Sequence, residues 1–264
     1  MRASPLAAST GPRAGVPPRL RIGLDLTALM PEATGVDTYL LELLEGLGAV
    51  DRRNRYSVFV NHEDRDRVPR LPGTFEVVRT ASRNRAVRLG WQQVGLPILG
   101  AARRLDVVHS PSFILPLADR RARHVLTIHD LTSFSHPRWH EPLRRSRLYR
   151  AAIVASIRLA ERICVPSQAV REEVVRLVPG VRAERIRVIP HGISDEFRPE
   201  AVGEAAVVRT RLGLPRSYLL FVGTIQPRKN LELLLEAYGR LVAEEAIDED
   251  LVLAGRLGWS YERV

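Results

Sequence analysis

Cysteine, lysine and long apolar runs are scarce in this chain of 264 residues. The single cysteine, Cys164, cannot form an internal disulfide, so we predict a reducing, cytoplasmic compartment. Its neighbours are apolar, and a packed core thiol is a better interpretation than a nucleophile. No stretch approaches the ~18 continuous apolar residues of a membrane-spanning helix, so we expect any bilayer contact to be peripheral.

Aromatic residues make up 6% of the chain, and its positive charge comes almost wholly from arginine. Lys229 is the only lysine, and the formal net charge is +10. Such a charge suits nucleic acid, an anionic membrane surface or phosphorylated small substrates. The arginines are scattered along the whole chain, and no nucleic-acid-binding motif is present. We therefore predict no nucleic-acid partner and keep peripheral membrane contact as an open alternative.

Short apolar runs alternate with amphipathic segments along the chain. We predict strands at Arg19–Leu26, Tyr56–Val60, Phe75–Val78, Asp106–His109, His124–His129, Arg162–Val165, Ile186–Ile189, Tyr218–Val222 and Leu251–Ala254. We predict helices at Val36–Leu47, Ala86–Leu99, Pro142–Leu159, Gln168–Leu177, Val207–Leu212 and Leu231–Leu241. This alternation is typical of an α/β fold with a doubly wound parallel sheet.

A segment rich in proline, glycine and charge, PHGISDEFRPE, indicates a domain boundary. We predict a disordered tail over residues 1–18, a complete α/β domain over residues 19–198 and the beginning of a second one over residues 199–264. The tail has no long apolar block and is not expected to be a signal peptide. A second α/β domain normally needs ~100 residues or more.

Several motifs with a known chemistry are absent. There is no GxxxxGK[ST] phosphate loop, no GxGxxG after the first strand and no GxSxG turn. His136 and His140 are four residues apart, but Pro137 lies between them and argues against a helical metal-binding pair. We predict no metal site and no bound cofactor.

Ligands of open α/β sheets bind beyond the carboxyl ends of the strands. This rule selects as candidate binding residues Gly35, His109, His129 with Asp130, Ser167, His191 and the loop Gly223–Lys229. His129 directly follows a predicted strand and suits hydrogen bonding to a substrate hydroxyl or proton transfer near neutral pH. A histidine merely packed against the backbone is the alternative, and the stronger one for His109.

The sequence GTIQPRKN, which begins at Gly223, is the strongest anion-binding candidate. It follows Leu219–Val222, an apolar run typical of a strand buried on both faces of a parallel sheet. Asn230 is placed to cap the next helix, whose start carries roughly +0.5 charge. Arg228 and Lys229 add two cations, so we predict that the loop binds phosphate. Two solvated surface cations are the alternative.

Seven segments occur in a definite order along the chain. They are IGLDLTALMPEATGVDTYLLELL, DVVHSPSFILPL, LTIHDLTSFSHP, ICVPSQAVREEV, IRVIPHGISDEFRP, LLFVGTIQPRKNLELLLEAYGRL and LVLAGRLGW. In order and spacing they resemble the family 4 retaining glycosyltransferases of the GT-B fold, from Arg19 to the end. The resemblance implies two Rossmann-like domains, one on the acceptor side and a C-terminal one that binds the nucleotide sugar, with no divalent metal.

The same resemblance implies roles for individual residues. Arg228 and Lys229 match the pair that holds the donor diphosphate, which offsets charge on the leaving nucleotide. His129 matches the histidine that contacts the donor sugar near the reacting carbon. Gly35 matches the glycine of the first loop, where the backbone approaches donor and acceptor, although many relatives have two glycines there.

The resemblance also implies the reaction, which is transfer of a hexose from a GDP- or UDP-sugar to a polysaccharide or glycolipid acceptor with retention of configuration. GTIQPRKN and AGRLGW look like the mannosyltransferase-type branch, so mannose from GDP-mannose is the leading expectation. The family's pair of donor-binding glutamates would lie beyond Val264, so we expect this chain to be weak or inactive by itself. A non-catalytic acceptor-binding or scaffold module and a nucleic-acid binder are the competing hypotheses.

Overall fold

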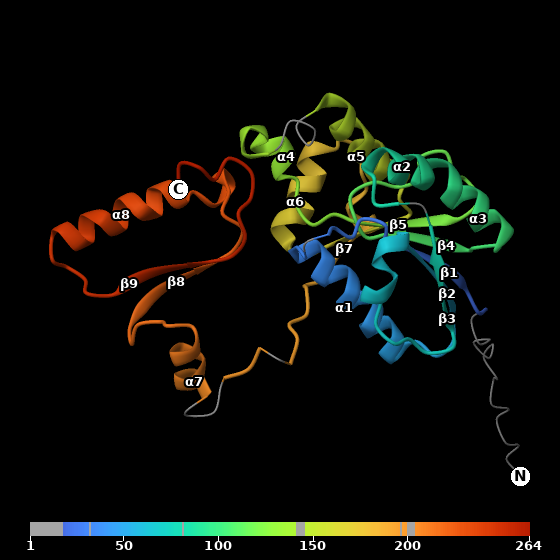
Figure 1. Ribbon diagram of the computed structural model, residues 1–264. Helices are drawn as coiled ribbons and strands as arrows, with labels where there is room; N and C mark the ends of the chain where they lie inside the picture. Colours follow the sequence, from blue (N-terminus) through green and yellow to red (C-terminus); the bar gives the residue numbers. More distant parts are fainter. Residues whose placement is uncertain (1–17, 32, 81, 141–145, 196, 200–203) are drawn as a thin grey trace, which may run out of the picture.

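Seven parallel strands form the main sheet of the computed structural model, which describes residues 18–31, 33–80, 82–140, 146–195, 197–199 and 204–264. Their order is β3-β2-β1-β4-β5-β6-β7 (Figure 1). The strands are β1 (Arg21–Asp25), β2 (Arg55–Val60), β3 (Phe75–Arg79), β4 (Val107–Ser110), β5 (Arg123–Thr127), β6 (Arg162–Val165) and β7 (Ile186–Val188). This arrangement confirms the predicted α/β class with a doubly wound parallel sheet.

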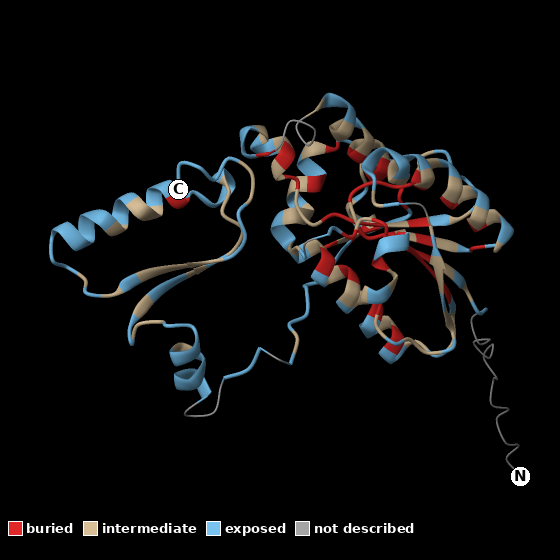
Figure 2. Ribbon diagram, in the orientation of Figure 1, coloured by how far each residue is buried: buried red, intermediate tan, exposed pale blue. Residues whose placement is uncertain are grey.

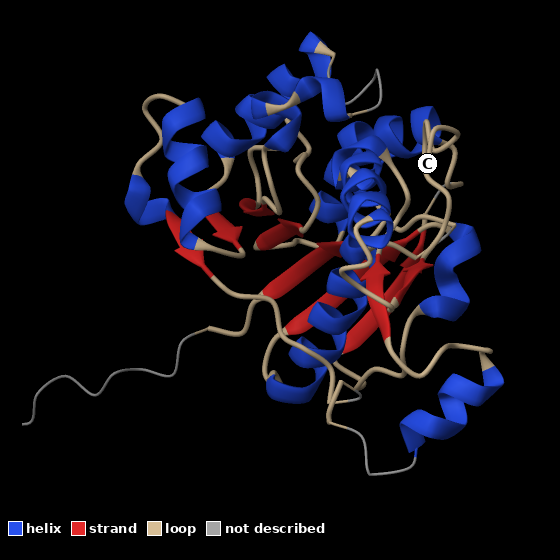
Figure 3. Cartoon of the chain, turned by 90° about the vertical axis from the view of Figure 1, so that its left-hand side faces the viewer, coloured by secondary structure: helices blue, strands red, loops and turns tan. Residues whose placement is uncertain are grey.

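Helices cover both faces of the main sheet, as Figure 3 shows. They are α1 (Gly35–Val50), α2 (Arg85–Gly90), α3 (Leu96–Ala102), α4 (Thr132–Ser135), α5 (Arg147–Leu159) and α6 (Gln168–Leu177), with 3-10 turns η1 (His62–Arg67), η3 (Pro137–Trp139) and η4 (Ala183–Arg185). Strand order reverses between β1 and β4, so the carboxyl ends of these two strands form the topological switch point. None of the helices in the described ranges is long and apolar enough to cross a membrane.

Polar side chains at the helix starts explain where the long helices begin. Oγ1 of Thr34 accepts a hydrogen bond from the amide of Asp37, whose carboxylate accepts one from the amide of Thr34, which makes a capping box at α1. Ser146 and Ser167 accept backbone hydrogen bonds at the starts of α5 and α6. The first residues of the predicted helix Pro142–Leu159 lie outside the described residues.

Two apolar layers between the sheet and its helices make up most of the core, and Figure 2 shows the buried residues gathered there. The layer between α1 and strands β1 and β2 contains Leu24, Leu40, Leu44, Val58 and Val60. The layer between α5, α6 and strands β5 and β6 contains Leu126, Ile153, Ile157, Ile163 and Val174. The main sheet is therefore a rigid support for the loops at its edges.

A π-helical turn, η2 (Trp91–Gly95), joins α2 to α3. The structure confirms a helical path over the predicted range Ala86–Leu99 and continues it to Ala102. In a regular α-helix, Pro97 would lack an N–H group and its ring would meet the carbonyl of Gln93. The wider π turn lets the chain pass this proline without ending the helix.

The second sheet has two parallel strands, β8 (Tyr218–Val222) and β9 (Asp250–Ala254), and is accompanied by α7 (Glu204–Arg211) and α8 (Leu231–Ala243). Figure 1 shows this part of the chain joined to the main sheet by an extended segment after β7. Leu219, Leu220 and Val222 expose 44, 54 and 72% of their surface. The prediction that this strand is buried on both faces is therefore wrong for the described structure, where β8 has β9 as its one neighbouring strand.

Leu126→Ala is expected to lower the free energy of unfolding by about 2–5 kcal/mol, because Leu126 is fully buried on β5. Leu148→Ala is the matched control on α5, since Leu148 is 82% exposed. The control should change stability by less than about 0.5 kcal/mol. Urea unfolding followed by circular dichroism measures both variants, and equal losses would contradict the placement of the core.

Candidate functional site

The candidate site lies at the carboxyl ends of β1, β4 and β5, next to the switch point of the main sheet. His109 lies within β4, and His129 follows β5. Gly35 is the first residue of α1, the helix that follows β1. The structure thus places these three sequence-predicted residues at the edge where open α/β folds bind ligands.

Four rings pack together at this edge, those of Tyr39, Phe113, His129 and His191. The ring of Tyr39 meets His129 edge-on with centroids 4.8 Å apart and lies 4.7 Å from the ring of His191. Phe113 and His191 each lie 5.6 Å from His129, measured between centroids. Phe113 is buried, His129 is half-buried and His191 is exposed. The imidazole of His129 is therefore held between α1 and the segments that follow β4 and β7.

One nitrogen of His129 is used within the protein. Its Nε2 lies 3.0 Å from the backbone oxygen of Pro111, and because a carbonyl only accepts, His129 donates from Nε2. Burial lowers the pKa of His129 and outweighs the Pro111 carbonyl, which raises it, so the ring is neutral at pH 7. Nδ1 is then the nitrogen that can accept a hydrogen bond. Hydrogen bonding of His129 to a substrate hydroxyl stays a prediction, and Nδ1 is the atom for it, because Nε2 donates to Pro111.

A threonine hydroxyl links His109 to Tyr39. Oγ1 of Thr127 lies 2.9 Å from Nε2 of His109 and 3.2 Å from Oη of Tyr39. Burial and the neighbouring His129 lower the pKa of His109 to about 4, while burial raises the pKa of Tyr39. Both side chains are uncharged at neutral pH and form a packed support next to His129. This arrangement fits the packed interpretation of His109.

Asp130 holds the start of α4. Its Oδ1 accepts hydrogen bonds from the amide and the hydroxyl of Thr132, at 3.0 and 2.5 Å. Because that hydroxyl donates to Asp130, it accepts from Nε2 of His140, which lies 2.9 Å away. Asp130 therefore has a local structural role, and a substrate-binding role for it remains a proposal.

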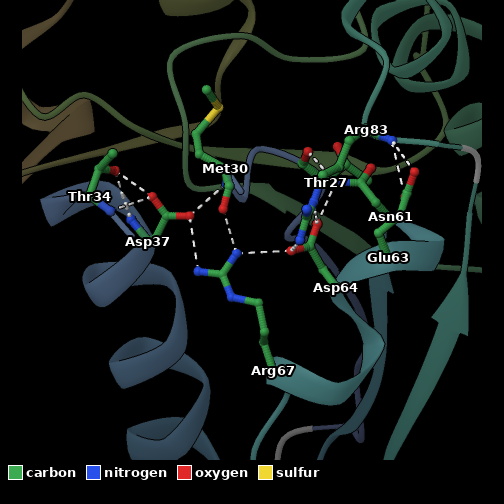
Figure 4. A network of polar contacts seen from close by, with 9 residues as sticks. All are labelled: Thr27, Met30, Thr34, Asp37, Asn61, Glu63, Asp64, Arg67 and Arg83. Atoms are coloured by element: carbon green, nitrogen blue, oxygen red, sulfur yellow. Dashed lines mark hydrogen bonds and ion pairs between the residues drawn. The ribbon is translucent and has the colours of Figure 1, made fainter. Parts of the chain in front are cut away.

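A network of charged and polar side chains fixes the loop that leads into α1 (Figure 4). Oδ1 of Asp37 accepts from the amide of Met30 at 2.6 Å, and its Oδ2 accepts from the amide of Thr34 at 2.9 Å. Nη1 of Arg67 donates to the carbonyl of Met30 at 2.6 Å. These contacts position the backbone next to Gly35, where an added Cβ would meet open space. Packing within the described chain does not require glycine there, and a role of Gly35 in binding stays a prediction.

Asp64 is the centre of this network, and its side chain is 0% exposed. It accepts hydrogen bonds from Nη1 of Arg67 at 2.9 Å, from Nη2 of Arg83 at 2.7 Å and from Nδ2 of Asn61 at 2.9 Å. Burial by itself would raise the pKa of Asp64, but these hydrogen bonds hold it below its usual value. Asn61 also donates to the carbonyl of Thr27 at 2.9 Å, which ties the network to the chain after β1.

The segments after β8 and β9 run side by side, and Ile225 and Leu257 form a parallel bridge between them. The amide of Gly223 donates to the carbonyl of Ala254 at 2.9 Å. A Cβ at Gly255 would lie 2.0 Å from the carbonyl oxygen of Gly223, and φ at Gly255 is 150°. Glycine is required at this position because the two backbones approach each other so closely.

Arg228 and Lys229 lie in the 3-10 turn η5 (Pro227–Lys229), and both are exposed. A Cβ at Gly223 would lie 3.8 Å from Cε of Lys229, so the lysine side chain reaches back toward the end of β8. Asn230 has φ 52° and ψ 41° and makes no side-chain hydrogen bond to the start of α8. The predicted cap is therefore wrong, because a capping residue needs extended backbone to bring its side chain to the first amides.

The predicted residues form two groups, one on each sheet. The group on the main sheet contains Gly35, His109, His129, Asp130 and His191, and the group on the second sheet contains Gly223, Arg228 and Lys229. Sequence reasoning missed Tyr39, Thr127 and Arg67 as parts of the site. A signal did exist for Tyr39, since a tyrosine on the apolar face of a helix needs a partner for its hydroxyl. The contacts of Arg67 span distant segments and left no such signal.

Two solved structures have an architecture similar to that of this chain. The chain is similar to Anabaena HepE, solved in complex with UDP and glucose, with 16% identity and a TM-score of 0.62 over 93% of this chain and 63% of that one. It is also similar to the UDP-GlcNAc 2-epimerase of Methanocaldococcus jannaschii, with 11% identity and a TM-score of 0.56 over 93% of this chain and 67% of that one. The fold is thus of the GT-B type.

Sequence comparison gives the family. Residues 33–197, more than half of the chain, match the model described as Glycosyltransferase Family 4, so the chain belongs to that family. It is 28% identical to O-antigen chain mannosyltransferase B of Escherichia coli over 242 residues, which are 86% of this chain and 61% of the relative. It is 44% identical to a D-inositol 3-phosphate glycosyltransferase of Streptomyces griseus over 82 residues, 30% of this chain and 16% of the relative. The chain spans about three fifths of the length of the E. coli relative.

Among the described residues, no group of three or more histidine, cysteine, aspartate or glutamate side chains could hold a metal ion. His140, one of the two histidines considered from the sequence, contacts the hydroxyl of Thr132 instead. Metal independence stays a prediction.

Asp64→Asn is expected to lower the free energy of unfolding by about 3 kcal/mol, because it removes the buried carboxylate that pairs with both Arg67 and Arg83. Glu236→Gln is the matched control, since it breaks the exposed pair between Glu236 and Arg240. That exposed pair contributes at most about 0.5 kcal/mol. Urea unfolding compares the two variants, and a loss in Asp64→Asn no larger than in the control would contradict a structural role for the network.

The pKa of His109, about 4 in the folded chain, predicts a pH dependence of stability. An unfolded histidine titrates near 6.5, so the unfolded state binds the proton more strongly than the folded state. The contribution of neutral His109 to the free energy of unfolding is complete above pH 6.5. It is lost as the pH falls toward 4, which lowers the free energy of unfolding by up to about 3 kcal/mol. His109→Gln should show a weaker fall over this window in urea unfolding at several pH values. The same pH dependence in both proteins would show that His109 does not cause it.

Proposed function

We propose that this chain is part of a retaining glycosyltransferase that moves a hexose from a nucleotide sugar to a polysaccharide or glycolipid acceptor. The observation that carries the proposal is the placement of His129, Tyr39 and Gly35 at the carboxyl edge of the main sheet in a chain of glycosyltransferase family 4. Mannose from GDP-mannose is the leading donor, supported by the similarity to an O-antigen mannosyltransferase. The same fold occurs in a UDP-GlcNAc 2-epimerase, so the fold by itself supports neither glycosyl transfer nor epimerisation.

Arg228 and Lys229 hold the donor diphosphate in this proposal. As the bond between the anomeric carbon and the diphosphate oxygen breaks, negative charge builds on that oxygen, and two cations in place beforehand offset it. Gly223, at the end of β8, lets the backbone approach the same phosphates. The reaction then needs no divalent metal and no bound cofactor, because side chains supply the positive charge.

His129 contacts the transferred sugar. Its Nε2 is engaged with Pro111, so a sugar hydroxyl donates to Nδ1 of the neutral ring. His191 and Asp130 complete the substrate-binding edge, and His109 supports it through Thr127. The exposed backbone at Gly35 lies beside the acceptor.

The location of the protein is part of the proposal. We place it in the cytoplasm, where nucleotide sugars are available, with its arginine-rich surface in peripheral contact with an anionic membrane that carries the acceptor. Nucleic acid is not a partner in this proposal. The non-catalytic acceptor-binding or scaffold module remains the competing function, and donor binding separates the two.

Calorimetric titration with GDP-mannose and UDP-glucose tests the proposal. Arg228→Gln and Lys229→Gln should each weaken donor binding about 10- to 100-fold, because a hydrogen bond to a charged group contributes about 1.5–3 kcal/mol. The double variant Arg209→Gln/Arg211→Gln, which removes one half-buried and one exposed cation from α7, is the matched control and should bind as the unchanged chain does.

Two outcomes would count against this function. Equal affinities in the loop variants and the control would remove Arg228 and Lys229 from the donor site. Failure of the full-length protein to bind either nucleotide sugar would contradict the proposal and favour the acceptor-binding module.

A further inference from the structure

A cavity of about 530 Å³ opens at the opposite edge of the main sheet, where β1 to β4 begin. Four arginines line it, Arg19, Arg21, Arg55 and Arg103, and the carboxylate in its described lining is Glu76. We call it the arginine pocket. Because the strands are parallel, this edge faces away from the carboxyl edge with its histidines, so its charge plays no part in the site described above.

Strand register places two of these arginines side by side. Arg21 on β1 and Arg55 on β2 are directly paired, and both are exposed. Like charges at neighbouring positions of a sheet destabilise it. A bound anion would remove this repulsion.

Other groups of the protein compensate the positive charge of the arginine pocket only in part. Nη1 of Arg21 donates to the carbonyl of Arg103 at 3.3 Å, and Asp106 accepts from the amide of Arg21 at 2.8 Å. Nη2 of Arg103 lies 3.3 Å from Glu76, whose side chain is 64% exposed, and exposed pairs of this kind contribute little. The pocket therefore keeps a net positive charge.

Two polar atoms of the lining residues are buried without a partner. Nε of Arg103 and Oγ1 of Thr74 have no hydrogen-bond partner within the described part of the chain. Nε of an arginine can only donate, and a hydroxyl donates as readily as it accepts. Each atom has less than 1 Å² exposed, so a ligand in the cavity reaches it only when the side chain of Arg103 or Thr74 moves, and buried donors left unpaired are costly.

We propose that the arginine pocket binds a small anion that carries two or more phosphate groups. A guanidinium matches two phosphate oxygens at once, and four of them around one cavity favour a ligand with several such oxygens. The volume is large enough for a pyrophosphate group with a small organic moiety attached. This site is separate from the proposed donor loop and does not depend on glycosyl transfer.

Calorimetric titration with inorganic pyrophosphate tests the site. The unchanged chain is titrated first, and then Arg228→Gln/Lys229→Gln, which removes the donor loop as a source of the signal and should still bind. Adding Arg21→Gln and Arg55→Gln to that variant should weaken binding about tenfold or more. Adding Arg209→Gln and Arg211→Gln instead removes the same charge from α7 and should leave the affinity unchanged. Equal affinities in these two quadruple variants would overturn the proposal.

Thermal unfolding shows whether the substituted chain is folded. Without ligand, Arg21→Gln/Arg55→Gln should melt at the same temperature as the unchanged chain or higher, because a repulsive pair is removed. With Arg228→Gln/Lys229→Gln present in every protein, pyrophosphate should raise the melting temperature of this variant and of the form that also carries Arg209→Gln/Arg211→Gln, but not of the form that also carries Arg21→Gln/Arg55→Gln. A rise in all three proteins would contradict the site.

Vesicle sedimentation distinguishes a soluble ligand from a lipid headgroup. The vesicles contain phosphatidylcholine, with or without a phosphatidylinositol bisphosphate. Sedimentation that requires both the phosphorylated lipid and Arg21 with Arg55 supports the site and identifies a headgroup as its source. Pyrophosphate binding without sedimentation supports the site with a soluble ligand, and absence of both contradicts it.

Discussion

Parallel pairing of β1 with β4, and of β4 with β5, is the constraint on which the candidate site depends. Leu24 pairs with His109, and His109 pairs with Val125, so three strands far apart in the sequence end at one edge. The residues that follow them are thereby brought together, among them His129 and the start of α1 at Gly35. Any change that shifted this register would move the histidines apart, whatever happened to the loops.

Buried charge gives the loop before α1 its shape. A carboxylate such as Asp64, taken out of water, is stable only if guanidinium and amide donors surround it, and Arg67, Arg83 and Asn61 do so from fixed directions. Apolar side chains of similar size would give comparable stability, but they would not specify where the carbonyl of Met30 lies. The network thus contributes geometry more than free energy, and that geometry is what a backbone next to a substrate needs.

Much of the fold and part of the site could be predicted from the sequence. Apolar periodicity locates the strands and long helices, because it is a local property of the sequence. The rule that ligands bind at the carboxyl ends of the strands selects His129 and its neighbours, because it follows from the topology of a parallel sheet. The ring contacts of Tyr39 could not be predicted, since they depend on how α1 crosses the sheet. The cap at Asn230 was wrongly predicted for a related reason: a left-handed residue depends on the surrounding chain, while residue preferences describe only the average case.

The contact between Tyr39 and His191 joins two parts of the chain that are far apart in the sequence. Tyr39 lies near the start of the family-matched region, and His191 lies near its end, on the segment that leads from β7 toward the second sheet. Through His191, that connecting segment therefore contacts the same rings that pack around the imidazole of His129. Because His191 contacts the rings of both Tyr39 and His129, the first residues after β7 and the imidazole of His129 are held by the same packing contacts.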